Sequence, residues 1–149
     1  MKHIELYTDG ACSGNPGVGG WGAVLIYNEH IKEISGYHKE TTNNRMELFA
    51  IVQGLAHLKE PCIVNIYSDS AYAVNAFNNK WIDAWQKNQW RTADKKEVKN
   101  RDLWNDLLLR LQPHKYTFIK VKGHSDNVYN NRCDALATSE VKRYVNMIK

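Results

Sequence analysis

The chain lacks the features that mark membrane-embedded and secreted proteins. Its 149 residues contain no run of about 18 apolar residues, the length that a membrane-spanning helix requires. The first residues, Met1 to Glu5, become polar at once and lack the apolar core of a secretion signal. We therefore expect a cytoplasmic protein with no membrane partner.

Cysteine and proline are also scarce. The three cysteines, Cys12, Cys62 and Cys133, are widely spaced and form neither a CxxC pair nor a Cys/His cluster of the zinc type, which favours reduced thiols. With 43% hydrophobic residues, 9 glycines and 3 prolines, the composition excludes fibrous and disordered classes. The length is typical of a single domain, which we expect to span residues 1–149.

The positive charge is concentrated in one segment, residues 80–101. It holds seven bases and three acids, and so accounts for the whole net charge of +4. Bases interleaved with tryptophans are typical of a surface that contacts nucleic-acid phosphates. The alternative is a helix with packed tryptophans and solvated lysines. We assign Trp85, Trp90 and Trp104 to packing, and Trp81 and the lysines to a binding face.

Hydrophobic periodicity and turn residues predict the order βββαβ…αβα, a mixed sheet with helices. The first strand is expected to end at Gly10, before a glycine-rich turn, and Asn100 is expected to cap a helix. The first three strands should form an antiparallel meander, and the fourth should be interior. The expected strands are Ile4–Asp9, Trp21–Tyr27, Ile31–Tyr37, Ile63–Tyr67 and Tyr116–Val121, and the expected helices are 43–58, 71–90 in two pieces, 100–111 and 128–145.

Four acidic residues could form one cluster. Asp9 and Asp69 each stand at the carboxyl end of a predicted strand, and would meet at one sheet edge if the strands are neighbours. Glu47, in the first turn of its helix, and Asp134 in the last helix could join them. Because clustered carboxylates repel one another, they favour a hard divalent cation, Mg²⁺ or Mn²⁺ rather than zinc. Taken singly, an acidic residue is more often a solvated surface carboxylate or a helix cap than a metal ligand.

Five short motifs surround these acids. They are Tyr7-Thr8-Asp9-Gly10-Ala11-Cys12 with Gly14-Asn15-Pro16-Gly17, Thr42-Asn43-Asn44-Arg45-Met46-Glu47-Leu48, Tyr67-Ser68-Asp69-Ser70, Val121-Lys122-Gly123-His124-Ser125 and Asn130-Asn131-Arg132-Cys133-Asp134-Ala135-Leu136-Ala137. In these motifs and their order, the sequence closely resembles the type 1 ribonuclease H family. The resemblance covers essentially the whole chain, and segment 80–101 resembles the helical basic protrusion of bacterial members.

The resemblance implies an α/β (α+β mixed) fold of the ribonuclease H type, with a five-stranded mixed sheet flanked by helices. It implies an endoribonuclease that hydrolyses the RNA strand of RNA–DNA hybrids. Two Mg²⁺ ions, or Mn²⁺ as substitute, would activate the attacking water and stabilise the leaving 3′ oxygen, giving 5′-phosphate and 3′-hydroxyl ends. His124 would assist by moving protons or releasing product. The family's metal-binding carboxylates fall on Asp9, Glu47, Asp69 and Asp134.

The resemblance also implies a set of substrate contacts, which suit recognition of shape and of the RNA 2′-hydroxyl. The minor-groove contacts are Cys12, Asn15, Asn43 and Asn44, the DNA-phosphate pocket is Thr42 and Asn100, and the protrusion contributes Trp81, Lys87, Lys95, Lys96 and Lys99. Backbone groups near Gly10 and Ala11 would read 2′-hydroxyls. Turn or cap chemistry is the alternative for the asparagines.

Two positions depart from the family pattern. Ala71 stands where many relatives have glutamine, and Glu40 stands where bacterial relatives often have a basic residue before the phosphate pocket. The alternatives to a hybrid-specific nuclease are a superfamily nuclease that acts on DNA or structured RNA, and a hybrid-binding module without catalysis. The groove asparagines and basic segment disfavour the first, and the complete acid set disfavours the second. We expect a monomer, because one cluster and one binding face fit in one chain.

Overall fold

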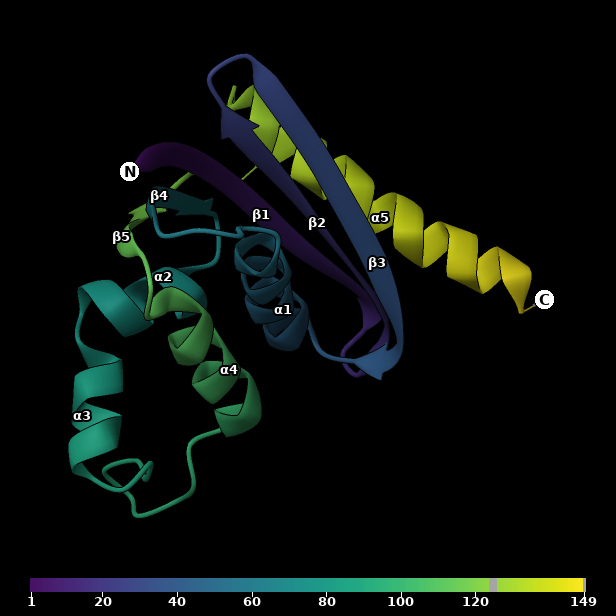
Figure 1. Ribbon diagram of the computed structural model, residues 1–149. Coiled ribbons are helices and arrows are strands. Elements are labelled where there is room, and N and C mark those ends of the chain that lie inside the picture. Colours follow the sequence, from purple (N-terminus) through teal and green to yellow (C-terminus); the bar gives the residue numbers. More distant parts are fainter. Residues whose placement is uncertain (124–125, 149) are drawn as a thin grey trace.

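The computed structural model describes residues 1–123 and 126–148 (Figure 1). The strands are β1 (Lys2–Gly14), β2 (Gly17–Tyr27), β3 (His30–Thr41), β4 (Cys62–Ser68) and β5 (Lys115–Lys120). The helices are α1 (Asn43–Ala56), α2 (Ala71–Asn78), α3 (Trp81–Lys87), α4 (Arg101–Leu111) and α5 (Val128–Met147). Each predicted strand and helix is present, with the segment predicted over 71–90 divided into α2 and α3.

One five-stranded sheet, in the order β3-β2-β1-β4-β5, forms the centre of the fold. The first three strands pair antiparallel as the predicted meander, whereas β4 pairs parallel with both β1 and β5. This arrangement confirms the mixed sheet and the interior position of β4. It also places the carboxyl ends of β1 and β4 side by side, which is the arrangement that the acid cluster requires.

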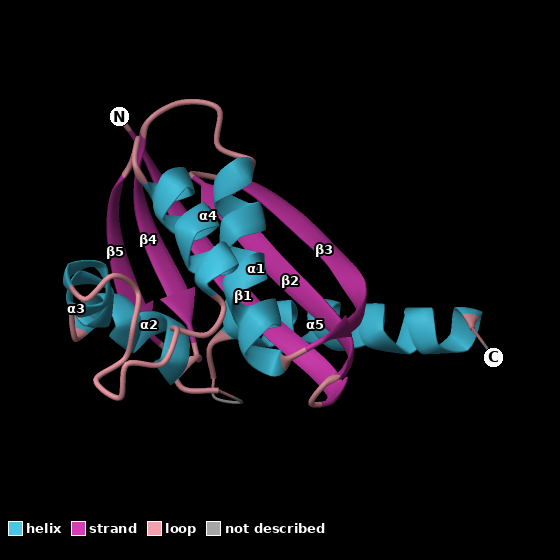
Figure 2. Cartoon of the chain, turned by 90° about the horizontal axis from the view of Figure 1, so that it is seen from below, coloured by secondary structure: helices cyan, strands magenta, loops and turns pink. Residues whose placement is uncertain are grey.

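Helices cover both faces of the sheet. Helices α1 and α4 lie over one face, and α5 crosses the other and extends past the sheet toward the C-terminus (Figures 1 and 2). The main core contains Leu6 of β1, Ile51 of α1, Ile66 of β4 and Trp104 of α4, all fully buried. Across residues 1–123 and 126–148, no helix combines the length and apolarity needed to cross a membrane.

Three helices that border the acid cluster begin at a side-chain cap. Thr42 Oγ1 accepts the Arg45 N–H at the start of α1, at 3.3 Å, and Ser70 Oγ accepts the Ala73 N–H at the start of α2, at 3.1 Å. Asn127 caps α5 in the same way. Asn100 occupies the predicted N-cap position of α4, but it makes no side-chain cap bond.

Strand β1 is longer than predicted. It continues through Gly10 to Gly14, so the expected end at Gly10 is wrong, and the turn between β1 and β2 contains only Asn15 and Pro16. The pairing explains the difference, because β1 pairs with β4 only as far as Tyr7 but pairs with β2 up to its own end. The many glycines hide this extension from the hydrophobic pattern.

A histidine after α4 fixes the start of β4. His114 Nδ1 accepts the backbone N–H of Cys62 at 3.0 Å, and burial lowers the pKa of the ring. Because protonation removes this acceptor, the bond stabilises the fold above the ordinary histidine pKa and is lost as pH falls through the lowered one. We expect His114→Leu to cost about 1 kcal/mol at pH 8 in urea denaturation, and less at pH 5.

The exposed His57 provides the control, because its ring Nδ1 lies 2.9 Å from the Gln53 carbonyl, a local contact at the end of α1. His57→Leu should change stability little at either pH. A His114→Leu effect that is equal at both values of pH would contradict the role given to the hydrogen bond.

Candidate active site

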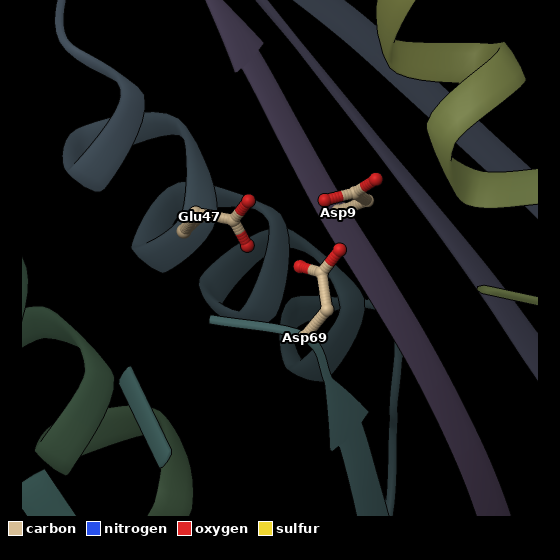
Figure 3. A group of neighbouring side chains, drawn as sticks. All are labelled: Asp9, Glu47 and Asp69. Atoms are coloured by element: carbon tan, nitrogen blue, oxygen red, sulfur yellow. The ribbon is translucent and has the colours of Figure 1, made fainter. Parts of the chain in front are cut away.

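Three carboxylates from separate elements converge at one edge of the sheet. Asp9 lies in β1, Glu47 in α1, and Asp69 directly after β4, and their side chains point toward one another (Figure 3). One oxygen from each of the three lies within 4.8 Å of the other two. The predicted convergence of these acids is therefore present in the structure.

The parallel pairing of β1 with β4 brings Asp9 and Asp69 together. The last paired residues of the two strands are Tyr7 and Tyr67, and each aspartate follows two residues later. The sequence had suggested that Asp9 stands at the end of its strand, but it lies inside β1. It lies just beyond the point where β1 stops pairing with β4. The predicted proximity is correct for this reason.

Glu47 reaches the cluster through a close approach of α1 to β1. It is the fifth residue of α1, beyond the first turn in which it was predicted. The Gly10 backbone N–H donates to Glu47 Oε1 at 3.2 Å and to Asp9 Oδ1 at 2.9 Å. A Cβ atom at Gly10 would lie only 2.6 Å from the Glu47 backbone nitrogen. The missing side chain of Gly10 thus permits the contact, a packing role that the sequence pattern did not reveal.

Burial and mutual repulsion make this cluster costly when it is charged. Asp9 and Glu47 are each only 4% exposed. Burial, together with the nearby charge of Asp69, raises the pKa of Asp9 to about 7. Burial and the charge of Asp9 raise the pKa of Glu47 well above its usual range. Within the described part of the chain, the buried Glu47 Oε2 also has no hydrogen-bond partner. A bound cation would neutralise these charges and satisfy this oxygen.

The fourth predicted acid borders the same hollow. Asp134 of α5 lines it but does not belong to the set of three whose oxygens approach within 4.8 Å. Its charge contributes to the raised pKa of Asp9. The structure thus brings all four acids to one hollow, with three in close contact. The remaining lining residues are Gly10, Asn43, Asn44, Ser70, Ala71 and Tyr72.

The predicted minor-groove residues lie at or beside this hollow. Asn43 and Asn44, at the start of α1, are part of its lining. Asn15, in the turn between β1 and β2, accepts the backbone N–H of Asn43 at 3.1 Å, and Cys12 Sγ donates to the Thr41 carbonyl at 3.4 Å. Hydrogen bonds therefore attach the β1–β2 hairpin to the end of β3 and the beginning of α1.

Arg45 connects the two residues of the predicted phosphate pocket. Its backbone N–H donates to Thr42, and its Nη1 donates to Asn100 Oδ1 at 3.2 Å. Arg45 lies within one of the five motifs, but the motif alone does not indicate this role. The sequence offers one signal for such a role, which is a basic residue two positions before Glu47. The structure shows that the helix around it is largely buried.

The basic segment combines packed tryptophans with exposed lysines. Trp104 and Trp90 are buried and Trp85 packs against the main core, whereas Trp81 is 38% exposed. These positions confirm the predicted division between packing and exposed tryptophans. The lysines assigned to the binding face are exposed, and they are Lys87, Lys95, Lys96 and Lys99.

His124 lies outside the described residues. The residue before it, Gly123, is close to the cluster, since a Cβ there would lie 2.8 Å from Asp69 Oδ2. The segment that contains the predicted histidine therefore begins beside a member of the carboxylate cluster.

Comparisons with known proteins identify the class. The RNase H family model matches residues 1–142. The chain is 62% identical over 143 residues to a protein named Ribonuclease H from Acetivibrio thermocellus, covering 96% of this chain and 97% of that protein. A Ribonuclease H from Chlorobium chlorochromatii is 58% identical over 142 residues, covering 95% and 97%.

Solved structures share the fold. LC9-RNase H1, described as a type 1 RNase H, aligns with a TM-score of 0.85 at 23% identity, over 95% of this chain and 73% of that one. LC11-RNase H1, solved in complex with RNA/DNA hybrid, aligns with a TM-score of 0.70 at 22% identity, over 95% and 99%. The fold is thus that of type 1 RNase H structures. The chain belongs to the RNase H family, and its enzyme class is ribonuclease H.

Proposed function

We propose that the protein hydrolyses the RNA strand of RNA–DNA hybrids at the carboxylate cluster, leaving 5′-phosphate and 3′-hydroxyl ends. The observation that carries the proposal is the convergence of Asp9, Glu47 and Asp69 in a hollow that Asp134 also lines. Family membership supports the same activity.

The donor set fits Mg²⁺, with Mn²⁺ as a substitute. All four side chains, Asp9, Glu47, Asp69 and Asp134, offer carboxylate oxygens, which hard cations prefer. We infer two ions in the substrate complex. When bound, they supply an activated water and stabilise the charge that develops on the leaving oxygen. The Gly10 N–H donates to both Asp9 and Glu47 and so orients the two carboxylates.

His124 is proposed to assist by moving protons or releasing product. An imidazole side chain can gain and lose a proton near neutral pH, which suits both tasks. The support for this proposal is the motif that contains His124 and the membership of the chain in the RNase H family.

Selection of a hybrid is proposed to occur in the minor groove. Asn43 and Asn44 line the hollow beside the carboxylates, and Asn15 and Cys12 adjoin them. Amide and thiol groups form hydrogen bonds without requiring one base, which suits recognition of 2′-hydroxyls and groove shape. The complex of LC11-RNase H1 with RNA/DNA hybrid supports this substrate class.

The exposed lysines of the basic segment are proposed to contact phosphates. We expect the double variant Lys95→Ala/Lys96→Ala to lower the slope of log KM against log salt concentration by about one to two. Steady-state cleavage of a hybrid at several salt concentrations measures this slope. The control Lys115→Ala/Lys142→Ala removes two exposed lysines elsewhere and should leave the slope unchanged. Equal slopes for both variants would contradict the assignment.

We also propose that the protein acts as a monomer in the cytoplasm. One hollow and one exposed basic segment within a single chain support this oligomeric state. Sedimentation that shows a stable dimer would contradict it.

The chemistry is tested by removing the metal and examining the products. A chelator should stop cleavage of the hybrid, and Mg²⁺ or Mn²⁺ should restore it. The upstream RNA product should be extendable by a polymerase, which requires a 3′-hydroxyl, and the downstream product should be ligatable through its 5′-phosphate. Cyclic or 3′-phosphate ends, or full activity in chelator, would contradict the proposed reaction.

A further inference from the structure

Asn100 uses its side chain in an unusual way for a residue at the start of a helix. It precedes α4 with a φ of 63°, yet it makes no side-chain cap bond. Asparagine tolerates this left-handed backbone better than most residues and commonly caps helices through its Oδ1 atom. Here the amide is directed instead toward Arg45 of α1 and Tyr72 of α2.

The neighbours of Asn100 determine which way its amide points. Arg45 Nη1 can only donate, so the atom 3.2 Å away must be the oxygen, Oδ1. On the other side, the Tyr72 hydroxyl donates to the Lys99 carbonyl at 3.5 Å and accepts the Trp104 Nε1–H at 3.2 Å. It therefore also accepts from Asn100 Nδ2, at 3.1 Å. One N–H of Nδ2 remains available for a ligand among the bonds that the described residues make.

Arg45 is itself held by a second contact. Its Nη1 and Nη2 donate to the two oxygens of Asp102, at 3.0 and 2.7 Å. The Asp102 side chain is 67% exposed, and an ion pair so exposed adds little to stability. The ion pair acts instead on geometry. Its two parallel hydrogen bonds fix the plane of the Arg45 guanidinium, and so they fix which of its donors faces Asn100.

Arg45 also lies on the helix that carries the cluster. It precedes Glu47 by two residues, and its backbone N–H donates to Thr42, the other residue of the predicted phosphate pocket. In the bonds that residues 1–123 and 126–148 make, the Thr42 hydroxyl only accepts, so its own proton stays available for donation. Arg45 thus connects both pocket residues to α1, and through α1 to the carboxylates.

We propose that Arg45 is a positioning residue for substrate: it holds the Asn100 amide so that one N–H stays directed away from the protein, toward the DNA-strand phosphate that the family resemblance already implies for this pocket. The proposal rests on the proposed function. Arg45 does not touch the phosphate in this arrangement. It selects the amide orientation, because with the amide flipped the guanidinium would face the Nδ2 donors.

Steady-state kinetics on a hybrid separate this role from catalysis. We expect Arg45→Met to raise KM about three- to tenfold, the effect of about one hydrogen bond, with kcat within about twofold of wild type. Arg45→Lys keeps the charge but not the fork and should behave similarly. Arg110→Met is the matched control, because Arg110 is an exposed base of α4 that approaches Asp106 only to 3.8 Å. It should leave KM unchanged.

A double-mutant cycle with Asn100→Ala tests whether the effect passes through the amide. If Arg45 acts by orienting Asn100, then Asn100→Ala and the double variant should have about the same KM. Additive increases in KM would contradict the proposal.

Neutral linkages in the DNA strand give a readout that loss of stability does not affect. A methylphosphonate placed at one DNA position at a time should raise the wild-type KM at one position most strongly. In the Arg45→Met variant, a methylphosphonate at that position should raise KM no more than a methylphosphonate at the other positions does. The proposal would be overturned if both Arg45 variants kept the wild-type dependence of KM on methylphosphonate position. It would also be overturned if both variants had the wild-type KM on the unmodified hybrid. A wild type that does not cut the hybrid would instead contradict the proposed function.

Discussion

Replacing Asp9 with asparagine is expected to abolish cleavage of a hybrid and, at the same time, to stabilise the metal-free protein. Asp9 belongs to the close set of carboxylates and is proposed to bind metal, so its loss should lower cleavage at least about a thousandfold. The stabilisation arises because the buried, charged carboxylate is unfavourable in the absence of a cation.

The sign of the stability effect follows from the pKa of Asp9. Burial raises this pKa to about 7, above the value of about 4 in the unfolded chain. A raised pKa means that the folded state binds more protons, so wild-type stability falls as pH rises through this window. We expect Asp9→Asn to exceed wild type by about 1–3 kcal/mol at pH 8 in chelator, with a smaller difference at pH 5.

Urea denaturation at the two values of pH measures this difference. Glu29→Gln is the control, because Glu29 lies exposed between β2 and β3 and away from the cluster. It should change neither stability nor cleavage. An Asp9→Asn protein that is less stable than wild type at pH 8 would contradict the electrostatic account of the cluster.

Replacing Gly10 with alanine is expected to damage both the fold and the site. The added Cβ would lie 2.6 Å from the Glu47 nitrogen and 2.6 Å from the Met46 carbonyl carbon. Both are backbone atoms, so rotation of a side chain cannot relieve the overlap. Helix α1 must move away from β1, at a cost of about 3 kcal/mol. The movement also carries Glu47 away from Asp9.

Denaturation and Mg²⁺ titration distinguish Gly10→Ala from the loss of a ligand. Asp9→Asn should weaken Mg²⁺ binding without destabilising the fold, whereas Gly10→Ala should do both. At a temperature where Gly10→Ala remains folded, its cleavage rate should still be lower than wild type by about a hundredfold, because a displacement of about 1 Å is enough to misplace a catalytic group. If the Gly10→Ala protein had the stability and the Mg²⁺ affinity of wild type, the close approach of α1 to β1 would be shown to be unnecessary.

Much of the fold is predictable because its signals are local. Alternation in β1 and the spacing of Leu48, Ile51 and Leu55 in α1 each follow from one buried face. The pairing of Asp9 with Asp69 could be anticipated because parallel neighbours end at the same edge.

The extended part of β1 could not be predicted in the same way. Its glycines, Gly10 and Gly14, carry no hydrophobic pattern. Gly14 has a positive φ at the turn into β2, whereas Gly10, like Gly22 of the paired strand β2, permits the close approach of a helix. Gly10 meets α1, and a Cβ at Gly22 of β2 would lie 2.7 Å from the Cys133 carbonyl oxygen of α5. Such contacts depend on tertiary packing, which spacing along the chain does not reveal.

The Arg45 network is also hidden from sequence. Arg45 and Asn100 are 55 residues apart, and their contact needs α1, α2 and α4 to be placed together. The motif that contains Arg45 suggests that the residue matters for function, but it does not indicate which residue Arg45 contacts. Asn100 stands at the predicted N-cap position, but its amide bonds to the distant residues Arg45 and Tyr72, which the sequence does not reveal.

The carboxylate cluster is proposed to hydrolyse the RNA strand of a hybrid. The most direct test is a hybrid labelled separately on each strand, incubated with Mg²⁺ and wild type or Asp9→Asn, beside matched double-stranded RNA, double-stranded DNA and single-stranded RNA. We expect cleavage of the hybrid alone, in its RNA strand alone, and none with Asp9→Asn. Binding without cleavage by the wild type in Mg²⁺ or Mn²⁺, or equal cleavage by Asp9→Asn, would contradict the proposal.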